Sequence, residues 1–480
     1  MRSDIIVRMK FLDREPELSR LLSLSRRHQG GLVILWGRRR IGKTRLLLEW
    51  VRRSRGLYTV ADQSSAAIQR RYFAESVGSV LPGFGEAAYS DWRTLLRALA
   101  RQARQQNWPG PLVIDELPYL VATSPELPSV LQRFIDHEAR EAQLCVALAG
   151  SSQHMMQGFQ LDRSSPLFGR ATEAFELLPL PAGHLARGLG LQGDASCVEA
   201  WAVWGGVPRY WELAAPFGRE LAAAVDGLIL DPAGPLHAEP DRLLVEEVPP
   251  ATALRPLLDA VGAGAHRLSE IAGRIGVPAT GLGRQLQRLQ ELGLLRREQP
   301  FGTTERGGKR SLYKIGDPLV RTWFRLVAPQ RSALAVAGTA ARRALWVRHR
   351  AALVVEAWEE LCRGAVPHLS PDENGGSTTW QPARRYWQGK GPEWDVVSLS
   401  VDGSSLLLGE VKWSDRPVGR RELEQIGREL AAKGVPDEAW ARGKSLCHVV
   451  FVPQVERGLR RRDTAPNAAV TAKQVLRVLR

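Results

Sequence analysis

Hydrophobic residues in the first third of the chain are grouped in short continuous runs. Three of these runs are LVILW at 32–36, LVI at 112–114 and LCVALAG at 144–150. Strands that are buried on both faces of a parallel sheet have this pattern, because neither face alternates with solvent. Amphipathic segments lie between the runs, so residues 11–175 predict an α/β domain built on a parallel sheet.

The pattern changes twice further along the chain. Residues from about 176 to 245 are mostly helical and are interrupted by prolines and by Gly205–Gly206. A compact helical segment follows at about 250–330, and mixed helix and strand patterns continue to the end. Clusters of proline and glycine at 231–235 and 371–376 indicate loops or boundaries. A chain of 480 residues has room for about three or four domains.

A phosphate-binding loop is the most specific motif. GRRRIGKT matches G-x-x-x-x-G-K-[ST] at every fixed position, between the run at 32–36 and a predicted helix at 45–53. Lys43 is expected to reach the β- and γ-phosphates of ATP, and Thr44 to bind Mg²⁺. The alternative, a glycine-rich turn that matches by chance, is disfavoured by the flanking elements. The predicted nucleotide-binding residues are Gly37, Arg38, Arg39, Arg40, Ile41, Gly42, Lys43 and Thr44.

Acidic and polar residues follow two of the other runs. Asp115 is expected to complete the Mg²⁺ shell, and Glu116 to orient or deprotonate the attacking water. An exposed pair of acids at a strand end is the alternative, which the nearby loop makes less attractive. Ser151 follows the run at 144–150, where it would sense the γ-phosphate. Arg170 would stabilise charge in the transition state, in cis or from a second copy in a homo-oligomer, or is a solvated surface arginine.

Together these segments resemble the archaeal-type ATPase family, a branch of the AAA+/STAND P-loop ATPases. The resemblance rests on FLDREPEL at 11–18, GRRRIGKT at 37–44, VIDELPYL at 113–120, AGSS at 149–152 and GGVPRYW at 205–211. It implies that residues 11–18 lie near the adenine of ATP. It also implies a helical lid whose Pro208 closes over the nucleotide.

Residues 251–316 predict a winged helix. Its expected helices and wing strands lie at 254–261, 268–276, 280–292, 294–297 and 311–315. The helix at 280–292 is the one that would enter the major groove of DNA. Outward side chains of this helix and of the wing loop at 301–310 are expected to contact DNA, namely Arg284, Gln287, Arg288, Arg306, Lys309 and Arg310.

The distribution of charge favours DNA as a partner. The chain has 66 Lys and Arg against 51 Asp and Glu, a formal net charge of +15. Residues 301–350 hold eleven Lys and Arg against only Glu305 and Asp317, so most of the excess lies there. The alternative is a winged helix that packs against protein.

A second set of candidate catalytic residues lies near the end of the chain. A hairpin is predicted with strands near 394–401 and 406–412, and it carries Asp395, Glu410 and Lys412. Two acids and a lysine on one sheet face suit Mg²⁺-assisted cleavage of a phosphodiester. The spacing D-x(14)-E-x-K resembles the PD-(D/E)xK nuclease superfamily.

That resemblance implies a metal-binding glutamate on the preceding helix at 353–363. Glu359 fits that position better than its neighbours Glu356 and Glu360. The alternative for the hairpin is an ion pair on an exposed edge strand. Glu410 lies inside the apolar segment LLLGEVKW, which favours the functional interpretation, because a buried acid needs a partner or a metal.

Composition excludes several classes. Four cysteines lie far apart, so neither a disulfide framework nor a cysteine-rich zinc module is expected. No stretch approaches the roughly 18 apolar residues of a membrane span, and the first ten residues lack the core of a signal peptide. We therefore expect a cytoplasmic protein without a membrane partner.

These inferences combine into one expected architecture and two functional hypotheses. The predicted domains are a P-loop ATPase core at 1–177, a helical lid at 178–247, a winged helix with a linker helix at 248–330 and an α/β nuclease-like domain at 331–480. The first hypothesis is an ATPase that binds DNA and cleaves it with its last domain. The second is a nucleotide-controlled, STAND-type switch or scaffold without nuclease activity.

Overall fold

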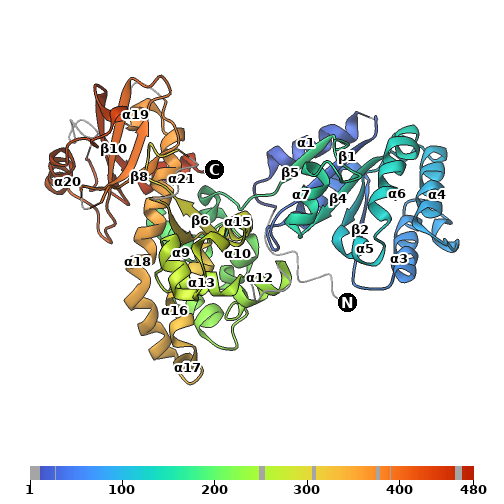
Figure 1. The fold of residues 1–480 in the computed structure, drawn as a ribbon, viewed down its shortest axis with the longest axis horizontal. Helices are drawn as coiled ribbons and strands as arrows, with labels where there is room; N and C mark the ends of the chain where they lie inside the picture. The colour runs from blue at the N-terminus through green and yellow to red at the C-terminus, as the bar shows by residue number, and fades with distance from the viewer. Residues whose placement is uncertain are drawn as a thin grey trace. The chain divides into compact units, whose positions relative to one another are not determined.

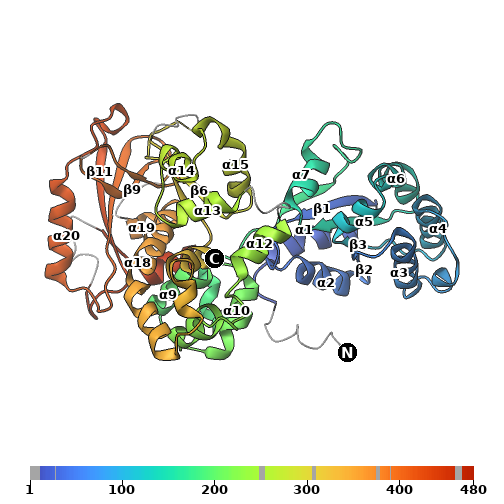
Figure 2. The same ribbon diagram turned by 60° about the horizontal axis from the view of Figure 1, so that its bottom comes forward.

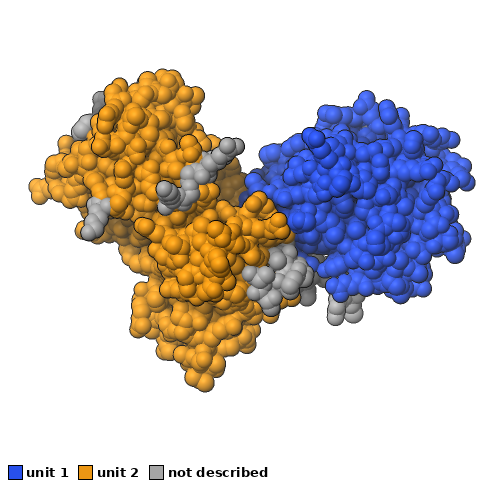
Figure 3. Space-filling model, in the orientation of Figure 1, with its two compact units in different colours: residues 1–179 blue, residues 180–480 orange. Residues whose placement is uncertain are grey.

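The computed structural model describes residues 11–27, 29–247, 254–304, 310–374, 379–389, 391–459 and 468–480. The chain divides into two compact units, the first ending at Pro179 and the second running from Leu180 to Arg480 (Figures 1 and 3). The predicted boundary between 177 and 178 lies two residues away. The finer division of the second unit into three domains stays a prediction.

The first unit is built on a parallel sheet, as predicted. Its five described strands have the order β2-β3-β4-β1-β5 (Figure 1). Their bounds are β1 Gly31–Trp36, β2 Leu57–Val60, β3 Leu112–Asp115, β4 Cys145–Gly150 and β5 Glu173–Glu176. The three apolar runs form β1, β3 and β4, and the outer strands β2 and β5 were not predicted.

Helices cover both faces of this sheet. They are α1 Glu15–Arg26, α2 Lys43–Ser54, α3 Ala66–Gly78, α4 Trp92–Gln105, α5 Leu117–Thr123, α6 Leu127–Phe134 and α7 Gln153–Leu161. Leu32 and Ile34 of β1 belong to a core shared with α3 to α6, while Val33 and Leu35 are equally buried on the other face. Neither face of β1 meets solvent, which explains the continuous apolar run.

The second unit begins with helices and is organised around one long helix. The bounds are α8 Leu185–Leu189, α9 Asp194–Trp204, α10 Pro208–Ala214, α11 Leu221–Val225, α12 Glu239–Glu247, α16 Pro318–Leu326, α17 Arg331–Leu334 and α18 Thr339–Ala365. The helix predicted at 353–363 is the last part of α18. Helix α9 packs against α16 and α18, so the predicted lid shares its core with later segments of the chain.

The winged helix forms where it was predicted. Its elements are α13 Arg255–Gly262, α14 Leu268–Ile275, α15 Gly283–Glu291, β6 Leu295–Glu298 and β7 Leu312–Ile315, with β6 and β7 antiparallel. The leucines assigned to the inner face of the third helix are all buried, namely Leu282, Leu286, Leu289 and Leu292. Their three- and four-residue spacing places them on one side of α15.

The end of the chain forms a mixed sheet with strand order β12-β11-β10-β9-β8. The bounds are α19 Pro371–Asn374, β8 Arg384–Tyr386, β9 Trp394–Leu399, β10 Ser405–Val411, α20 Arg420–Ala432, β11 Ser445–Val452, β12 Ala468–Thr471 and α21 Ala472–Val478. The predicted hairpin is the antiparallel pair β9 and β10, and β10 pairs in parallel with β11. Figure 2 shows this sheet between α20 and α18.

Two expectations from composition concern the whole chain. The four cysteines all lie in the described part of the chain and form no disulfide, and Cys145, Cys197 and Cys362 are buried. In the described part of the chain no helix is both long and apolar enough to cross a bilayer.

Candidate functional site

The phosphate loop joins the end of β1 to the first turn of α2. Gly37 has a φ of 151°, and a Cβ there would lie 2.6 Å from the carbonyl oxygen of Leu177. Gly42 has a φ of 96° and caps α2, which begins at Lys43. Both positions therefore suit glycine. The loop brings backbone N–H groups and the positive end of a helix dipole to one place, which is the arrangement that binds phosphate.

The side chains of Lys43 and Thr44 each have defined hydrogen-bond partners. The Lys43 ammonium is buried and donates to the carbonyl oxygens of Gly37 at 2.6 Å and Arg38 at 3.2 Å. Thr44 Oγ1 donates to Asp115 Oδ2 at 2.9 Å. The predicted magnesium ligands Thr44 and Asp115 are thus in direct contact, although 71 positions separate them in the sequence.

Asp115 has a further partner that the sequence did not indicate. The hydroxyl of Tyr58, in β2, donates to Asp115 Oδ2 at 2.8 Å. Burial and the neighbouring Asp115 carboxylate raise the pKa of Tyr58, so this phenol stays a donor. Sheet order explains the contact, because β2 is the neighbour of β3, whose last residue is Asp115.

Glu116 and Ser151 also meet, as their strands β3 and β4 are neighbours. Glu116 Oε2 accepts from Ser151 Oγ at 3.0 Å and from the Ser151 amide at 3.4 Å. Glu116 has a left-handed backbone with φ of 54°, which is uncommon for a side-chain-bearing residue and occurs where a site constrains the chain. The two predicted residues form one polar pair at the carboxyl edge of the sheet.

Two side chains from outside the loop contact it, those of Tyr119 and Arg14. Arg39 donates to the hydroxyl of Tyr119 in α5 at 3.0 Å. Arg14, which is 7% exposed, donates to the carbonyl oxygens of Ile41 at 3.4 Å and Leu178. Arg14 belongs to the FLDREPEL segment, so that segment lies against the loop. Its contact with adenine stays a prediction.

Arg170 and Pro208 were also predicted to contact the nucleotide. Among the described residues, neither has a hydrogen bond or ion pair with the loop. The Nε of Arg170 donates to both carboxylate oxygens of Asp136, at 2.9 and 3.0 Å. Pro208 is the first residue of α10 in the second unit. The roles of both residues stay predictions.

Comparison with known proteins identifies the first part of the chain. Residues 11–213 match a family model described as an ATPase domain predominantly from Archaea. This part of the chain is an ATPase domain similar to those of Archaea. Residues 323–426 of this ATPase match a second model, for archaeal and bacterial proteins of unknown function. The first unit is therefore a nucleotide-binding ATPase domain, as its loop predicted.

The chain is also similar to one curated protein and to solved structures. An uncharacterized protein of Methanocaldococcus jannaschii is 27% identical over 429 residues, covering 88% of this chain and 91% of that protein. The structure of a Walker-type ATPase of Pyrococcus abyssi is 21% identical and covers 67% of this chain and 99% of its own, with a TM-score of 0.51. The ORC2 protein of Aeropyrum pernix is 15% identical over 68% and 97% of the two chains, with a TM-score of 0.45. The Pyrococcus structure supports the fold.

The C-terminal acids of the ATPase lie on neighbouring strands, as predicted. Asp395 in β9 is half-buried, and its Oδ2 accepts from the Val411 amide at 3.0 Å. Burial raises the pKa of Asp395, and so does the charge of Glu410 on β10. Burial also raises the pKa of Glu359, and Asp395 adds to that effect. The three predicted acids therefore interact electrostatically.

Glu410 is already paired with two lysines. Lys412 donates to its Oε1 at 2.8 Å, and Lys433, which directly follows α20 and which the sequence did not single out, contacts Oε2. Burial opposes ionisation of Glu410, but these two hydrogen bonds outweigh it and lower its pKa. Among the described residues, no group of three or more His, Cys, Asp or Glu side chains is placed to hold a metal ion. The metal-binding role of Glu359, Asp395 and Glu410 stays a prediction.

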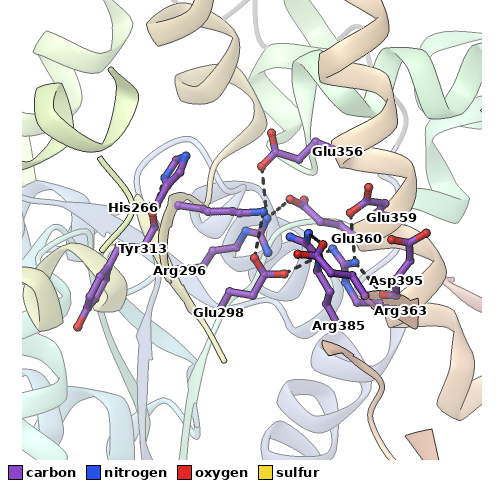
Figure 4. A network of polar contacts seen from close by, with 12 residues as sticks. His266, Arg296, Glu298, Tyr313, Glu356, Glu359, Glu360, Arg363, Arg385 and Asp395 are labelled. Atoms are coloured by element: carbon purple, nitrogen blue, oxygen red, sulfur yellow. Dashed lines mark hydrogen bonds and ion pairs between the residues drawn. The ribbon is translucent and has the colours of Figure 1, made fainter. Parts of the chain in front are cut away.

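An ion-pair network connects the winged helix with α18 beside these acids (Figure 4). Arg296 of β6 contacts Glu356 and Glu360, and Arg321 of α16 donates to Glu360 at 3.0 Å. At the other end, Arg363 donates to Glu359 at 3.4 Å and to the carbonyl oxygen of Asp395 at 3.0 Å. All three glutamates of α18 are thus paired with arginines, and the partner of Glu359, Arg363, also contacts Asp395 in the hairpin.

The predicted DNA-contacting residues divide into two groups. Arg284 and Gln287 are exposed on α15, while Arg288 is half-buried and pairs with Glu291 at 3.3 Å. Arg310 pairs with Glu438 of the last domain at 3.6 Å. Two further predicted contacts, Arg306 and Lys309, lie outside the described residues.

The charge argument for DNA needs a correction. Of the eleven cations at 301–350, nine lie in the described part of the chain. Seven of these nine form ion pairs with acids of the same unit, namely Arg310, Lys314, Arg321, Arg331, Arg342, Arg343 and Arg350. Acids distant in sequence, such as Asp226 and Glu199, compensate a segment that looks strongly basic when read alone.

The wing also packs against the last domain. Phe301 lies edge-on to Trp440 with ring centroids 5.0 Å apart, and its amide donates to the carbonyl oxygen of Arg385 at 2.9 Å. Both rings belong to the apolar cluster around Tyr386 and Trp394. The exposed face of α15 is therefore the better candidate surface for DNA than the wing.

Proposed function

We propose that this ATPase hydrolyses ATP with Mg²⁺ in its first unit and binds DNA with its second. We further propose that its last domain cleaves DNA in a metal-dependent reaction. The contact of Thr44 with Asp115, next to the pair of Glu116 and Ser151, is the observation that carries the ATP part. The coupling of Asp395 with Glu359 and Glu410 supports the nuclease part.

The residues of the first unit have separate tasks in hydrolysis. Loop amides and Lys43 bind the phosphate chain, and Glu116 orients the attacking water and accepts its proton. Thr44 and Asp115 offer hydroxyl and carboxylate oxygens, which fit Mg²⁺. When bound there, Mg²⁺ neutralises phosphate charge.

Arg170 is proposed to supply positive charge to the transition state from a second copy of the chain. Its ion pair with Asp136 holds it on its own unit, and the side chain is 29% exposed. A homo-oligomer would allow it to reach a neighbouring site.

DNA binding is proposed to use the exposed side of α15, because Arg284 and Gln287 extend from it to solvent. We expect the substitution Arg284→Ala to weaken binding of duplex DNA by about tenfold. This loss corresponds to the lower part of the roughly 1–3 kcal/mol that one good contact to a base contributes. Fluorescence anisotropy with a labelled duplex at several salt concentrations measures it.

Arg71→Ala in α3 is the matched control, because it removes the same charge from an exposed arginine of the first unit. Equal weakening by both substitutions would mean that Arg284 acts only through net charge. A smaller salt dependence in Arg284→Ala alone would assign this residue to the phosphates.

The nuclease proposal assigns Glu359, Asp395 and Glu410 to the metal and Lys412 to the attacking water. The resemblance to PD-(D/E)xK enzymes and the antiparallel pairing of β9 with β10 support it. Carboxylate oxygens suit Mg²⁺, provided that Lys412 and Lys433 release Glu410.

We expect Glu410→Gln to abolish nicking of supercoiled plasmid, because the amide keeps the shape of the side chain but loses its charge. The measurement is gel analysis after incubation with Mg²⁺ or Mn²⁺, with and without ATP. Glu424→Gln on α20 is the matched control, as this glutamate is 37% exposed in its side chain and pairs with Arg420 of the same helix. Intact plasmid with the unmodified protein under every condition would contradict the proposal.

A nucleotide-controlled switch without cleavage is the second candidate. The two ammonium groups on Glu410 favour it, since they satisfy this acid without a metal. In that case DNA affinity differs strongly between the ATP and ADP states, while DNA stays intact.

A further inference from the structure

A cavity of about 560 Å³ lies in the second unit, between the winged helix and α18. Residues of α13, β7, α16, α18 and β8 line it, so it is formed by segments far apart in the sequence. Its volume falls within the roughly 300–1,000 Å³ of small-molecule sites.

Four cations line the cavity, namely Lys314, Arg321, Arg325 and Arg385, together with the acids Glu356 and Glu359. Lys314, Arg321 and Arg385 form ion pairs with acids. The side-chain Nε atoms of Arg321 and Arg385 are buried and have no hydrogen-bond partner among the described residues. A buried donor without a partner is costly, and an anion in the cavity would satisfy it.

Arg325 adds charge that its own unit does not neutralise. No ion pair is recorded for it in the described part of the chain, in contrast to most cations of residues 301–350. The charge of Arg325 also acts on His349. Burial is the largest cause of the lowered pKa of His349, and the charges of Arg325 and Arg348 add to it. The surroundings of the cavity therefore have an excess of positive potential.

Apolar side chains also line the cavity. They are Val261, Phe324 and Val355, and Phe324 supplies an aromatic ring. A cavity lined by both cations and apolar side chains fits a ligand that has a phosphate at one end and a flat, largely apolar group at the other. A nucleotide has this division, with bases that pack against aromatic and apolar side chains.

We infer that this cavity binds a nucleoside 5′-phosphate, either as a free nucleotide or as the terminal residue of a nucleic-acid strand. The free nucleotide needs neither DNA binding nor cleavage. The strand end rests on the proposed function, because Glu359 both lines the cavity and faces Asp395, so a captured end lies next to the proposed nuclease acids. Figure 4 shows Glu359 beside Arg363 and near Asp395.

Calorimetric titration of the full-length chain tests the inference. The titration uses the Lys43→Ala variant, which lacks the lysine proposed to bind phosphate in the ATP site, so that nucleotide binding to that site is weakened. The probes are AMP, adenosine, and a single-stranded 12-nucleotide DNA with a 5′-phosphate or a 5′-hydroxyl. Ala352→Phe fills the cavity from an exposed position of α18, and Ala344→Phe adds the same ring at an exposed position of α18 that does not line the cavity.

We expect AMP or the 5′-phosphorylated strand to bind, and adenosine and the 5′-hydroxyl strand to bind at least about tenfold more weakly. Ala352→Phe and Arg325→Gln should each weaken binding to a similar degree, while Ala344→Phe should not. Binding of AMP identifies a free nucleotide, and binding of the phosphorylated strand alone identifies a strand end.

Two results would overturn the inference. One is no binding of either phosphorylated probe. The other is binding that both Ala352→Phe and Arg325→Gln leave unchanged. Because Arg325→Gln adds no bulk to the cavity, a folding defect of Ala352→Phe does not decide the outcome. The plasmid assay with Glu410→Gln tests cleavage separately, so failure of one proposal is distinguishable from failure of the other.

Discussion

Replacing Lys43 by alanine is expected to reduce ATP hydrolysis by at least about 100-fold, because the substitution removes a charged hydrogen-bond donor to the phosphate that is transferred. The Lys43 ammonium sits inside the loop, on the carbonyl oxygens of Gly37 and Arg38. A phosphate chain that enters the loop would take over this group. Release of inorganic phosphate measures the rate, and a fluorescent ATP analogue measures affinity.

Arg52→Ala is the matched control for this substitution. Arg52 lies on the same helix α2, is 70% exposed in its side chain and pairs with Glu49 on the surface. Its removal should leave hydrolysis unchanged, because exposed ion pairs contribute little. If Lys43→Ala kept more than a tenth of the activity, the loop would not be the site of hydrolysis. Thermal denaturation of both variants separates a lost phosphate contact from unfolding.

The ATPase site was predictable because its signals are local. The motif at 37–44 specifies both the loop and the start of α2, and the apolar run before Asp115 specifies a buried strand that ends at an acid. The structure was needed only to show which strands are neighbours in the sheet. Sheet order places Tyr58 on Asp115, and no pattern near residues 57–60 announces that contact.

The second unit was harder to predict because its interactions are distant in sequence. The winged helix and the hairpin have clear periodicity and formed as expected. The apparent basic segment did not persist as a charged surface, since partners such as Asp226 and Glu360 come from other helices. Charge counted along a sequence predicts total charge well, but it does not predict which charges remain unpaired after folding.

Replacing Glu116 by glutamine is expected to lower ATP hydrolysis by at least about 100-fold, the contribution of a general base. Affinity for ATP should change little, because the amide keeps the volume of the side chain and an oxygen that accepts from Ser151. This combination of slow hydrolysis and normal binding distinguishes Glu116 from Lys43. Glu75→Gln, at an exposed position of α3, is the control.

Ser151 supplies the sharper test of the same pair. If Ser151 acts by holding Glu116, Ser151→Ala slows hydrolysis in the unmodified protein but adds nothing when Glu116 is already glutamine. Additive losses would instead assign Ser151 a contact of its own with the phosphate. The amide of Ser151 lies 3.4 Å from the same carboxylate oxygen, so the alanine variant keeps one of the two contacts. A partial loss, larger than that of Glu75→Gln and smaller than that of Glu116→Gln, therefore supports the holding role.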